Sequence, residues 1–204
     1  MELYDSEEQQ VEAIKDWWKE NGKAVIFGAV LGLGGLFGWR YYQDAALEAR
    51  DLASESYIKT ITTLTEQGAD AQAQVQGFID ENQDIEYSVL AALQLAKVQV
   101  DAGEYDNALK QLEWAKASTK DAALAPLVSY RVARIKAEQG NLDAAMAELN
   151  TITDDSWTGR VAELRGDLAR RQGDKDAAYR AYSEAQQAAD ASQGLKFKLD
   201  DLAK

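Results

Sequence analysis

The chain has 204 residues, no histidine, no cysteine and a formal net charge of −13, because 35 acidic residues outnumber 22 lysines and arginines. Without histidine or cysteine, serine, cysteine and zinc chemistries of the usual kinds lack their base, nucleophile or ligands. A strongly negative surface repels nucleic acid and anionic lipid. The composition therefore argues against these enzymes and against nucleic-acid binding, and we expect no catalytic, cofactor-binding or metal-binding residue.

The segment 23–42 is apolar, and three structures compete for it: a membrane anchor, a cleaved signal and a soluble core helix. Its uncharged part, 24–39, would span about 24 Å as a helix, while a bilayer core is about 30 Å thick. Lys23 and Arg40 can extend toward the headgroups, and aromatic residues flank both ends as they do at membrane interfaces. Repeated glycines destabilise a helix in water but are ordinary where transmembrane helices pack closely. These features favour a transmembrane helix, whose predicted packing positions are Gly28, Gly32, Gly34 and Gly38.

Residues 1–22 are expected to form a short cytoplasmic tail. A cleaved signal begins with a positive region, whereas residues 1–23 contain seven acidic residues and only three lysines. The segment that follows is therefore predicted to be an uncleaved anchor. The three lysines outnumber Arg40 and Arg50 on the other side, and positive residues favour the cytoplasmic face of a membrane. Residues 43–204 are thus expected on the opposite side, as a single domain.

Three segments of this domain share one pattern, in repeats at about 88–118, 126–152 and 158–190. The pattern is a small residue, six spacers, a glycine, four spacers and an alanine. Successive glycines are separated by 37 and 33 residues. The pattern occurs as Ala96, Gly103 and Ala108, then Ala133, Gly140 and Ala145, then Gly166, Gly173 and Ala178.

Each position of the pattern has a role in a pair of antiparallel helices. The glycine can adopt the left-handed conformation that ends one helix, and Asn141 or Asp174, directly after it, can cap the next. The small residue and the alanine let the two helices pack closely. Four residues after the alanine comes a larger apolar side chain, expected between neighbouring pairs: Leu112, Leu149 or Tyr182. The pattern predicts an all-α fold, in which a helical solenoid follows one transmembrane helix.

Further helices are expected at both ends of the solenoid. Residues 45–67 are predicted to form a long helix that continues from the anchor, and 70–81 a shorter partner. At the carboxyl end, a capping helix is predicted over 193–204. It places Leu195, Leu199 and Leu202 on one helical face and charged residues on the other, as a terminal helix requires.

The repeats resemble the tetratricopeptide repeat, which has a period near 34 residues, although its early tryptophan and closing proline are absent. In such solenoids the first helix of each pair builds a concave binding face. We expect that face to form a partner-binding groove that mixes apolar and charged side chains: Leu90, Leu93, Lys97, Tyr130, Arg134, Glu138, Arg160, Glu163 and Asp167. The alternative is that Leu93 and Tyr130 pack against neighbouring helices.

A closer resemblance covers essentially the full chain. With "IKDWWKENGKAVIFGAVLGLGGLFGWRYY" and "SVLAALQLAKVQVDAGEYDNALKQLEWA", the chain resembles the family of ancillary SecYEG translocon subunits of proteobacteria, the YfgM family. The resemblance implies a single-span inner-membrane protein with a tetratricopeptide-like periplasmic domain. It also implies association with the SecYEG translocon and with PpiD, a membrane-anchored periplasmic chaperone of the prolyl-isomerase class. A role in passing newly exported, unfolded chains to chaperones follows from the same resemblance.

Two classes of function remain open on the sequence. In the first, the protein is a tethered, non-enzymatic adaptor beside the translocon, and it binds a chaperone or an emerging chain. In the second, it is an envelope scaffold or a stress-response regulator that acts through its cytoplasmic tail. Deletion of the tail would separate the two.

Overall fold

The computed structural model describes residues 7–202. Over this range every regular element is a helix and no strand occurs, so the predicted all-α fold is confirmed. The chain divides into two compact units, Met1–Ala53 and Ser54–Lys204. Helix α1 (Glu7–Gln67) begins in the first unit and ends in the second.

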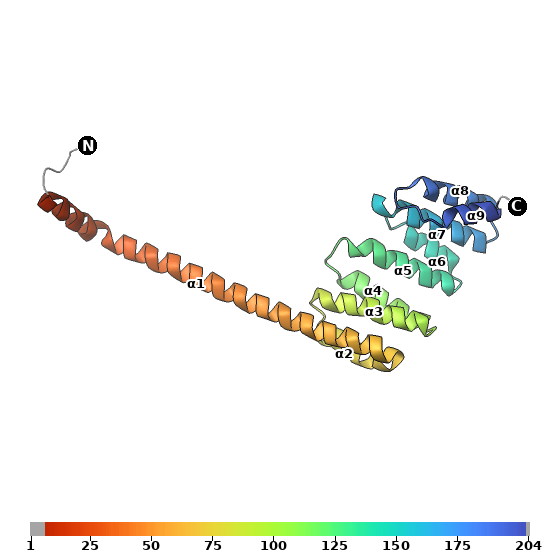
Figure 1. Cartoon of the computed structure of the whole chain (residues 1–204), viewed down its shortest axis with the longest axis horizontal. Coiled ribbons are helices and arrows are strands. Elements are labelled where there is room, and N and C mark those ends of the chain that lie inside the picture. Colours follow the sequence, from red (N-terminus) through yellow and green to blue (C-terminus); the bar gives the residue numbers. More distant parts are fainter. Residues whose placement is uncertain (1–6, 203–204) are drawn as a thin grey trace. The chain divides into compact units, whose positions relative to one another are not determined.

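The first unit is formed by the amino-terminal part of α1, which is red to orange in Figure 1. Among residues 7–202, α1 holds the one stretch that is long and apolar enough to cross a membrane, and 6% of that stretch is buried. Leu36 and Phe37 are 67% and 70% exposed. Because water would penalise so much exposed apolar surface, this helix suits a lipid environment.

The second unit is a series of antiparallel helix pairs. The pairs are α3 with α4, α5 with α6, and α7 with α8, and the two helices of each pair pack together. Contacts of α4 with α5 and of α6 with α7 join consecutive pairs, which therefore lie side by side (Figure 1). After the end of α1, the elements are η1 (Gly68–Ala71), α2 (Gln72–Glu81), α3 (Glu86–Asp101), α4 (Tyr105–Ser118), α5 (Leu124–Glu138), α6 (Leu142–Leu149), η2 (Asp155–Trp157), α7 (Thr158–Arg171), α8 (Lys175–Gln187) and α9 (Leu195–Leu202).

The three repeat glycines end the first helix of each pair. Gly103, Gly140 and Gly173 have φ values of +78°, +83° and +84°, a conformation that favours glycine. At each turn the next backbone N–H donates to a carbonyl oxygen five residues earlier, over 2.7 Å, 2.9 Å and 3.0 Å respectively. These bonds satisfy carbonyl groups that the helix end would leave unpaired. The predicted turn is therefore confirmed at all three positions.

The remaining positions of the pattern hold the pairs together. The three alanines, Ala108, Ala145 and Ala178, are fully buried, and the larger side chains four residues later are buried as well. In the third pair, a Cβ atom at Gly166 would overlap the ring of Tyr182, so the small residue is required there. The predicted close packing is confirmed.

The caps of the second helices differ from one another. Asp174 accepts a hydrogen bond from the backbone N–H of Ala177 over 2.8 Å, as predicted. Asn141 makes no side-chain cap bond to α6, so the prediction that it caps this helix is wrong. Its backbone still serves the turn, because its carbonyl oxygen accepts from the Ala145 N–H over 2.9 Å.

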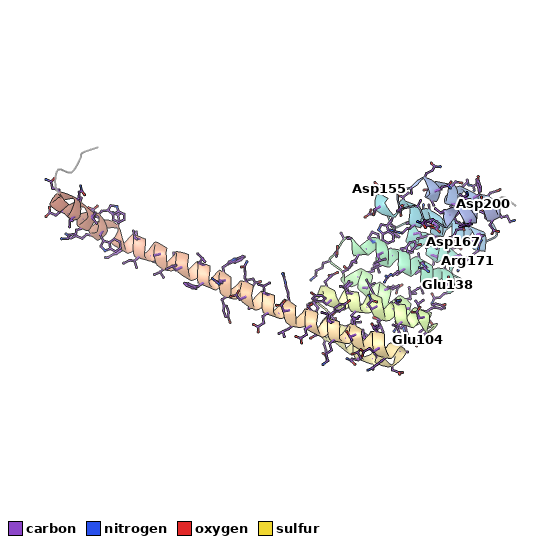
Figure 2. All side chains as sticks on the ribbon, viewed as in Figure 1. Glu104, Glu138, Asp155, Asp167, Arg171 and Asp200 are labelled. Atoms are coloured by element: carbon purple, nitrogen blue, oxygen red, sulfur yellow. The ribbon has the colours of Figure 1, made fainter. Side chains whose placement is uncertain are left out.

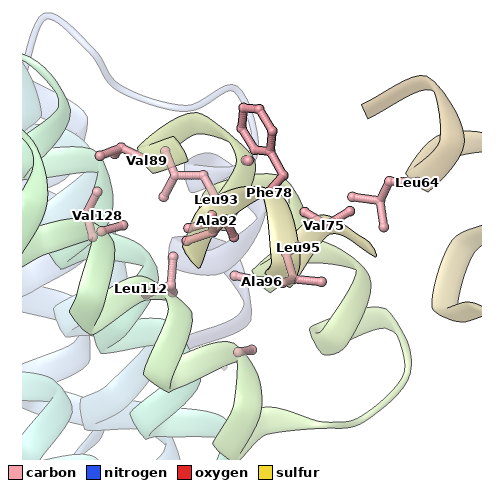
Figure 3. Close-up of a cluster of buried hydrophobic side chains, with 14 of the residues drawn as sticks. Leu64, Val75, Phe78, Val89, Ala92, Leu93, Leu95, Ala96, Leu112 and Val128 are labelled. Atoms are coloured by element: carbon pink, nitrogen blue, oxygen red, sulfur yellow. The ribbon is translucent and has the colours of Figure 1, made fainter. Parts of the chain in front are cut away.

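Two further pieces complete the second unit. At the start, Leu64 of α1 and Val75 and Phe78 of α2 join a buried cluster with side chains of α3, α4 and α5 (Figure 3). At the end, Leu195 of α9 is buried with Leu199 and Leu202 packed beside it. The sequence predicts helices over these stretches, but α2 begins at Gln72 rather than at residue 70, and α9 covers Leu195–Leu202 of the predicted 193–204. The last two residues of that prediction lie outside the described residues.

Candidate partner-binding groove

Two cavities that share Arg134 and Glu138 lie on the side of the repeats formed mainly by the first helices of the pairs. We call them together the groove. The first cavity, of about 300 Å³, is lined by Leu93, Ala96, Lys97, Val100, Asp101, Tyr105, Leu112, Arg131, Arg134, Ile135 and Glu138. The second, of about 340 Å³, is lined by Arg134, Ala137, Glu138, Leu164, Asp167, Leu168, Arg170, Arg171 and Lys198.

The first cavity combines an apolar wall with charged side chains. Leu93 and Leu112 are buried, and with Ile135 they supply apolar surface from three helices. Arg131 is half-buried, and its burial, followed by the charge of neighbouring Arg134, lowers the pKa of its guanidinium. The cavity therefore offers both hydrophobic contact and positive charge.

The boundary between the two cavities is fixed by an ion pair. Arg171 of α7 binds the Glu138 carboxylate of α5 over 2.6 Å, and it also donates to the Ala137 carbonyl oxygen over 3.1 Å. Glu138, Asp167 and Arg171 are labelled on the same side of the repeats in Figure 2. Helices α5 and α7, from different pairs, are thus linked by side chains that line the groove.

In the second cavity, Lys198 and two carboxylates form a network of ion pairs. The Lys198 ammonium of α9 lies 2.7 Å and 2.9 Å from the two Asp167 oxygens and 2.8 Å from the Glu163 carboxylate. Partial burial opposes the charge on Lys198, but these two carboxylates outweigh it and raise its pKa. Tyr182 also donates to Asp167 over 2.7 Å, and burial together with that carboxylate raises the pKa of its hydroxyl.

A third cluster lies outside both cavities. The rings of Tyr130 and Trp157 are 5.6 Å apart between centroids, and the Arg160 guanidinium lies 4.9 Å from the centre of the Trp157 ring. Burial raises the pKa of the Tyr130 hydroxyl. Tyr130 therefore packs against a neighbouring helix segment, which is the alternative that the sequence left open.

The structure brings only part of the predicted set together. Lys97, Arg134, Glu138 and Asp167 line the groove, and so does Leu93, although it is buried in the core. Four other predicted residues line neither cavity: Leu90, Tyr130, Arg160 and Glu163. Partner binding by any of these residues remains a prediction.

Sequence reasoning missed several groove residues, among them Arg131, Tyr105 and Lys198. Arg131 precedes Arg134 by three residues on the same helical face, so helical spacing was a usable signal for it. Lys198 had no such signal, because its place depends on how α9 packs against the third pair.

Among residues 7–202, the predicted packing glycines of the span have open space beside them. A Cβ atom at Gly28, Gly32, Gly34 or Gly38 would meet nothing within 4 Å. Across residues 7–202 there is likewise no group of three or more acidic, histidine or cysteine side chains arranged to hold a metal ion. The groove and the span therefore stand as the two candidate interaction surfaces.

Comparison with known proteins first defines the fold class of this chain. The family model described as a tetratricopeptide repeat-like domain matches residues 15–204. A solved tetratricopeptide repeat protein from Parabacteroides merdae aligns with 78% of this chain and 60% of its own length, with a TM-score of 0.53 and 16% identity. The fold is therefore that of a tetratricopeptide repeat-like protein, as the repeat pattern predicted.

Two relatives narrow the class to one family. The ancillary SecYEG translocon subunit of Escherichia coli (strain K12) is 37% identical over 182 residues, which cover 89% of this chain and 88% of the relative. The protein of the same name from Haemophilus influenzae is 35% identical over 198 residues, which cover 96% and 97%. The chain belongs to the family of ancillary SecYEG translocon subunits, and the resemblance found in its sequence is confirmed.

Proposed function

We propose that this protein is a membrane-tethered, non-enzymatic adaptor of the SecYEG translocon. Its single apolar span anchors it in the bacterial inner membrane, and its repeat domain binds a periplasmic chaperone of the PpiD kind and helps transfer newly exported chains to it. The relatives are named as subunits of that translocon. The observation that carries the adaptor role is the groove, with apolar and charged side chains in adjoining cavities.

The anchor contributes to this function by raising local concentration. A binding domain held at the membrane meets a membrane-anchored partner at high effective concentration, so weak contacts in the groove suffice. The exposed glycines of the span supply a second contact, because small residues let another transmembrane helix approach closely. We expect this face to meet a helix of the translocon or of the chaperone.

The proposed orientation has the amino terminus in the cytoplasm. Lys15, Lys19 and Lys23 precede the span, while Arg40 and Arg50 follow it, and positive residues favour the cytoplasmic side. Protease added to intact spheroplasts should then digest the repeat domain and spare the tail. Survival of the domain in spheroplasts, followed by its digestion after lysis, would show the opposite orientation.

Site-specific photocrosslinking in living cells tests the adaptor role. A photoreactive residue at Gly32 should crosslink to a membrane component of the translocon or to the chaperone, and one at Lys97 in the groove should capture the chaperone or an exported chain. Arg180 of α8 is the matched control, because it is exposed and lines neither cavity. Equal capture from Lys97 and Arg180 would contradict binding in the groove.

The regulator function is kept as a second candidate because of the tail. Val11, Ile14, Trp17 and Trp18 are each at least 50% exposed, and their spacing places them on one side of α1. An exposed apolar face in this part of the chain suits a role of its own in binding. Deletion of residues 1–14 should leave translocon and chaperone capture intact under the adaptor proposal; loss of stress-response regulation alone would support the second candidate.

A further inference from the structure

The first cavity contains two arginines that have no acidic partner. Within residues 7–202, neither Arg131 nor Arg134 forms an ion pair or a hydrogen bond through its guanidinium. The acidic residues of the same cavity do not compensate them. Glu138 is engaged by Arg171 over 2.6 Å, and Asp101 is exposed and forms no ion pair.

Uncompensated positive charge is unexpected at this place. Arg131 is half-buried, and removing a cation from water has a cost unless a counter-charge or hydrogen bonds replace the water. The chain as a whole carries a net charge of −13, so acidic residues are plentiful. The lowered pKa of Arg131 has burial and Arg134 as its causes and no carboxylate among them, which agrees with the missing partner.

The second cavity differs from the first in the ion pairs that its cations form. There Lys198 is neutralised by Asp167 and Glu163, and Arg170 lies 3.4 Å from Asp201. Lys198, Arg170 and Arg171, which line only the second cavity, thus each have an acidic partner supplied by the fold, whereas Arg134, which lines both cavities, has none among the described residues. In the first cavity, Arg131 and Arg134 are left without such a partner within residues 7–202, so a carboxylate of another molecule can fill this place.

An apolar wall lies beside the two arginines. Leu93, Leu112 and Ile135 are almost fully buried, and Val100 and Tyr105 extend the same surface. A volume of about 300 Å³ is within the range of small-ligand pockets and accommodates a few side chains rather than a folded element. The cavity therefore matches a short segment with both an apolar and an anionic side chain.

We propose that the first cavity binds a protein segment in which a carboxylate side chain lies next to a leucine-sized apolar side chain. The guanidinium groups of Arg131 and Arg134 hold the carboxylate, and the wall formed by Leu93 and Ile135 holds the apolar group. Arginine suits this role because its planar group donates two parallel hydrogen bonds to one carboxylate. The proposal rests on the adaptor function above and specifies which chemistry the groove recognises.

Peptide binding to the full chain in nanodiscs of zwitterionic lipid tests the proposal. The probe is a short fluorescein-labelled peptide with one aspartate between two leucines and an amidated carboxyl end, and its twin carries asparagine in place of the aspartate. The acidic peptide should bind about ten- to hundredfold more tightly than its twin, as expected for charge-assisted hydrogen bonds. Its affinity should fall as salt concentration rises.

Variants locate the site. The pair Arg131→Gln and Arg134→Gln should remove the preference for the acidic peptide, whereas Arg180→Gln, with the same loss of charge outside the groove, should keep it. The single variant Arg134→Gln replaces an exposed residue, so it should fold and should bind the acidic peptide more weakly. It tests the proposal if the double variant does not fold. Unchanged affinity in Arg134→Gln, or equal binding of the two peptides to the natural chain, overturns the proposal.

Two further results separate this inference from the adaptor function. If inorganic phosphate displaces the acidic peptide as well as the unlabelled peptide does, the site is a simple anion site and the peptide proposal is wrong. If the double variant no longer binds the acidic peptide but is still captured with the translocon and the chaperone in cells, the cavity is a carboxylate site and the adaptor binds its partners elsewhere. If the pair binds the peptide normally while capture is lost, the adaptor proposal stands without this site.

Discussion

The two units of the chain use similar apolar residues in opposite ways. In the first unit, Leu36 is 67% exposed and Phe37 is 70% exposed, while in the second unit Leu149 and Tyr182 are fully buried. The repeat domain is therefore stabilised by contacts within the chain, as expected for packing away from water. The span has few such contacts and depends on what surrounds it. The same residue type thus has different physical roles in the two units.

The glycines of the two units also differ in their surroundings. In the second unit, Gly166 has to be small because the ring of Tyr182 occupies the space of a Cβ atom. In the first unit, Gly28, Gly32, Gly34 and Gly38 have open space around them. Packing inside the chain explains the first case and leaves the second unexplained, which is why contact of the span glycines with a helix of another molecule stays a prediction.

The largest expected difference between the units comes from one leucine substitution made in each. Leu149→Ala removes a fully buried side chain between neighbouring pairs, so it should destabilise the repeat domain by about 2 to 5 kcal/mol. Leu36→Ala should leave the unfolding temperature of that domain unchanged. Thermal unfolding of the full chain in nanodiscs, followed by circular dichroism, measures both. Equal melting of the two variants would contradict the assigned core.

Overpacking gives the next comparison. Ala145 is fully buried where α5 and α6 meet, so Ala145→Leu should force side chains apart and cost about 1 to 3 kcal/mol. Ala29→Leu adds the same atoms at an exposed position of the first unit. Its unfolding curve should match that of the natural chain. A stable Ala145→Leu variant would show that the repeat pattern has been aligned wrongly.

The repeat frame could be predicted from sequence because each of its positions acts locally. A glycine that ends a helix and an alanine five residues later belong to one turn and its two helices. Gly140 and Ala145 therefore show in sequence what they do in structure. The apolar side chain four residues further, such as Leu149, follows from helical periodicity alone.

The groove was predicted less well because it depends on contacts between distant segments. Lys198 reaches Asp167 across 31 residues, and Arg171 reaches Glu138 across 33. No local pattern specifies such pairs, so the sequence placed Asp167 in the groove without showing that Lys198 of the same chain binds its carboxylate. The contact of Tyr130 with Trp157 could not be read from the sequence for the same reason, since Trp157 lies 27 positions further along.

A smaller effect is expected from ion pairs, and it depends on pH. Glu148 receives hydrogen bonds from Lys116 and Lys136; burial acts in the opposite direction, but these bonds prevail and lower its pKa below 4.5. A carboxylate whose pKa is lower in the folded chain stabilises the fold above its unfolded pKa, and this contribution is lost as pH falls through the folded value. Glu148→Gln should cost about 1.5 kcal/mol at neutral pH and progressively less in acid.

The control for this prediction is the exposed pair of the first unit. Lys19 and Asp16 are 3.1 Å apart, but their side chains are 77% and 73% exposed, so water and salt screen them. Asp16→Asn should therefore leave the unfolding temperature unchanged at every pH. A difference between Glu148→Gln and the natural chain that stays constant down to pH 3 would contradict the assigned role of the carboxylate.

The smallest expected effect on stability compares two helices within the second unit. Both α6 and α8 are the second helix of a repeat. Asp174 accepts from the Ala177 N–H, whereas Asn141 makes no such bond, although both residues follow a glycine of positive φ. Loss of a side-chain cap typically costs about 1 kcal/mol, so Asp174→Ala should destabilise the domain by that amount. Asn141→Ala should change stability by less than about 0.5 kcal/mol, as at other surface positions without a specific contact. Hydrogen exchange at the first turns of α8 and α6 measures the two effects where they arise, and equal loss of protection at both helices would show that the turn sequence, rather than the observed bond, determines capping.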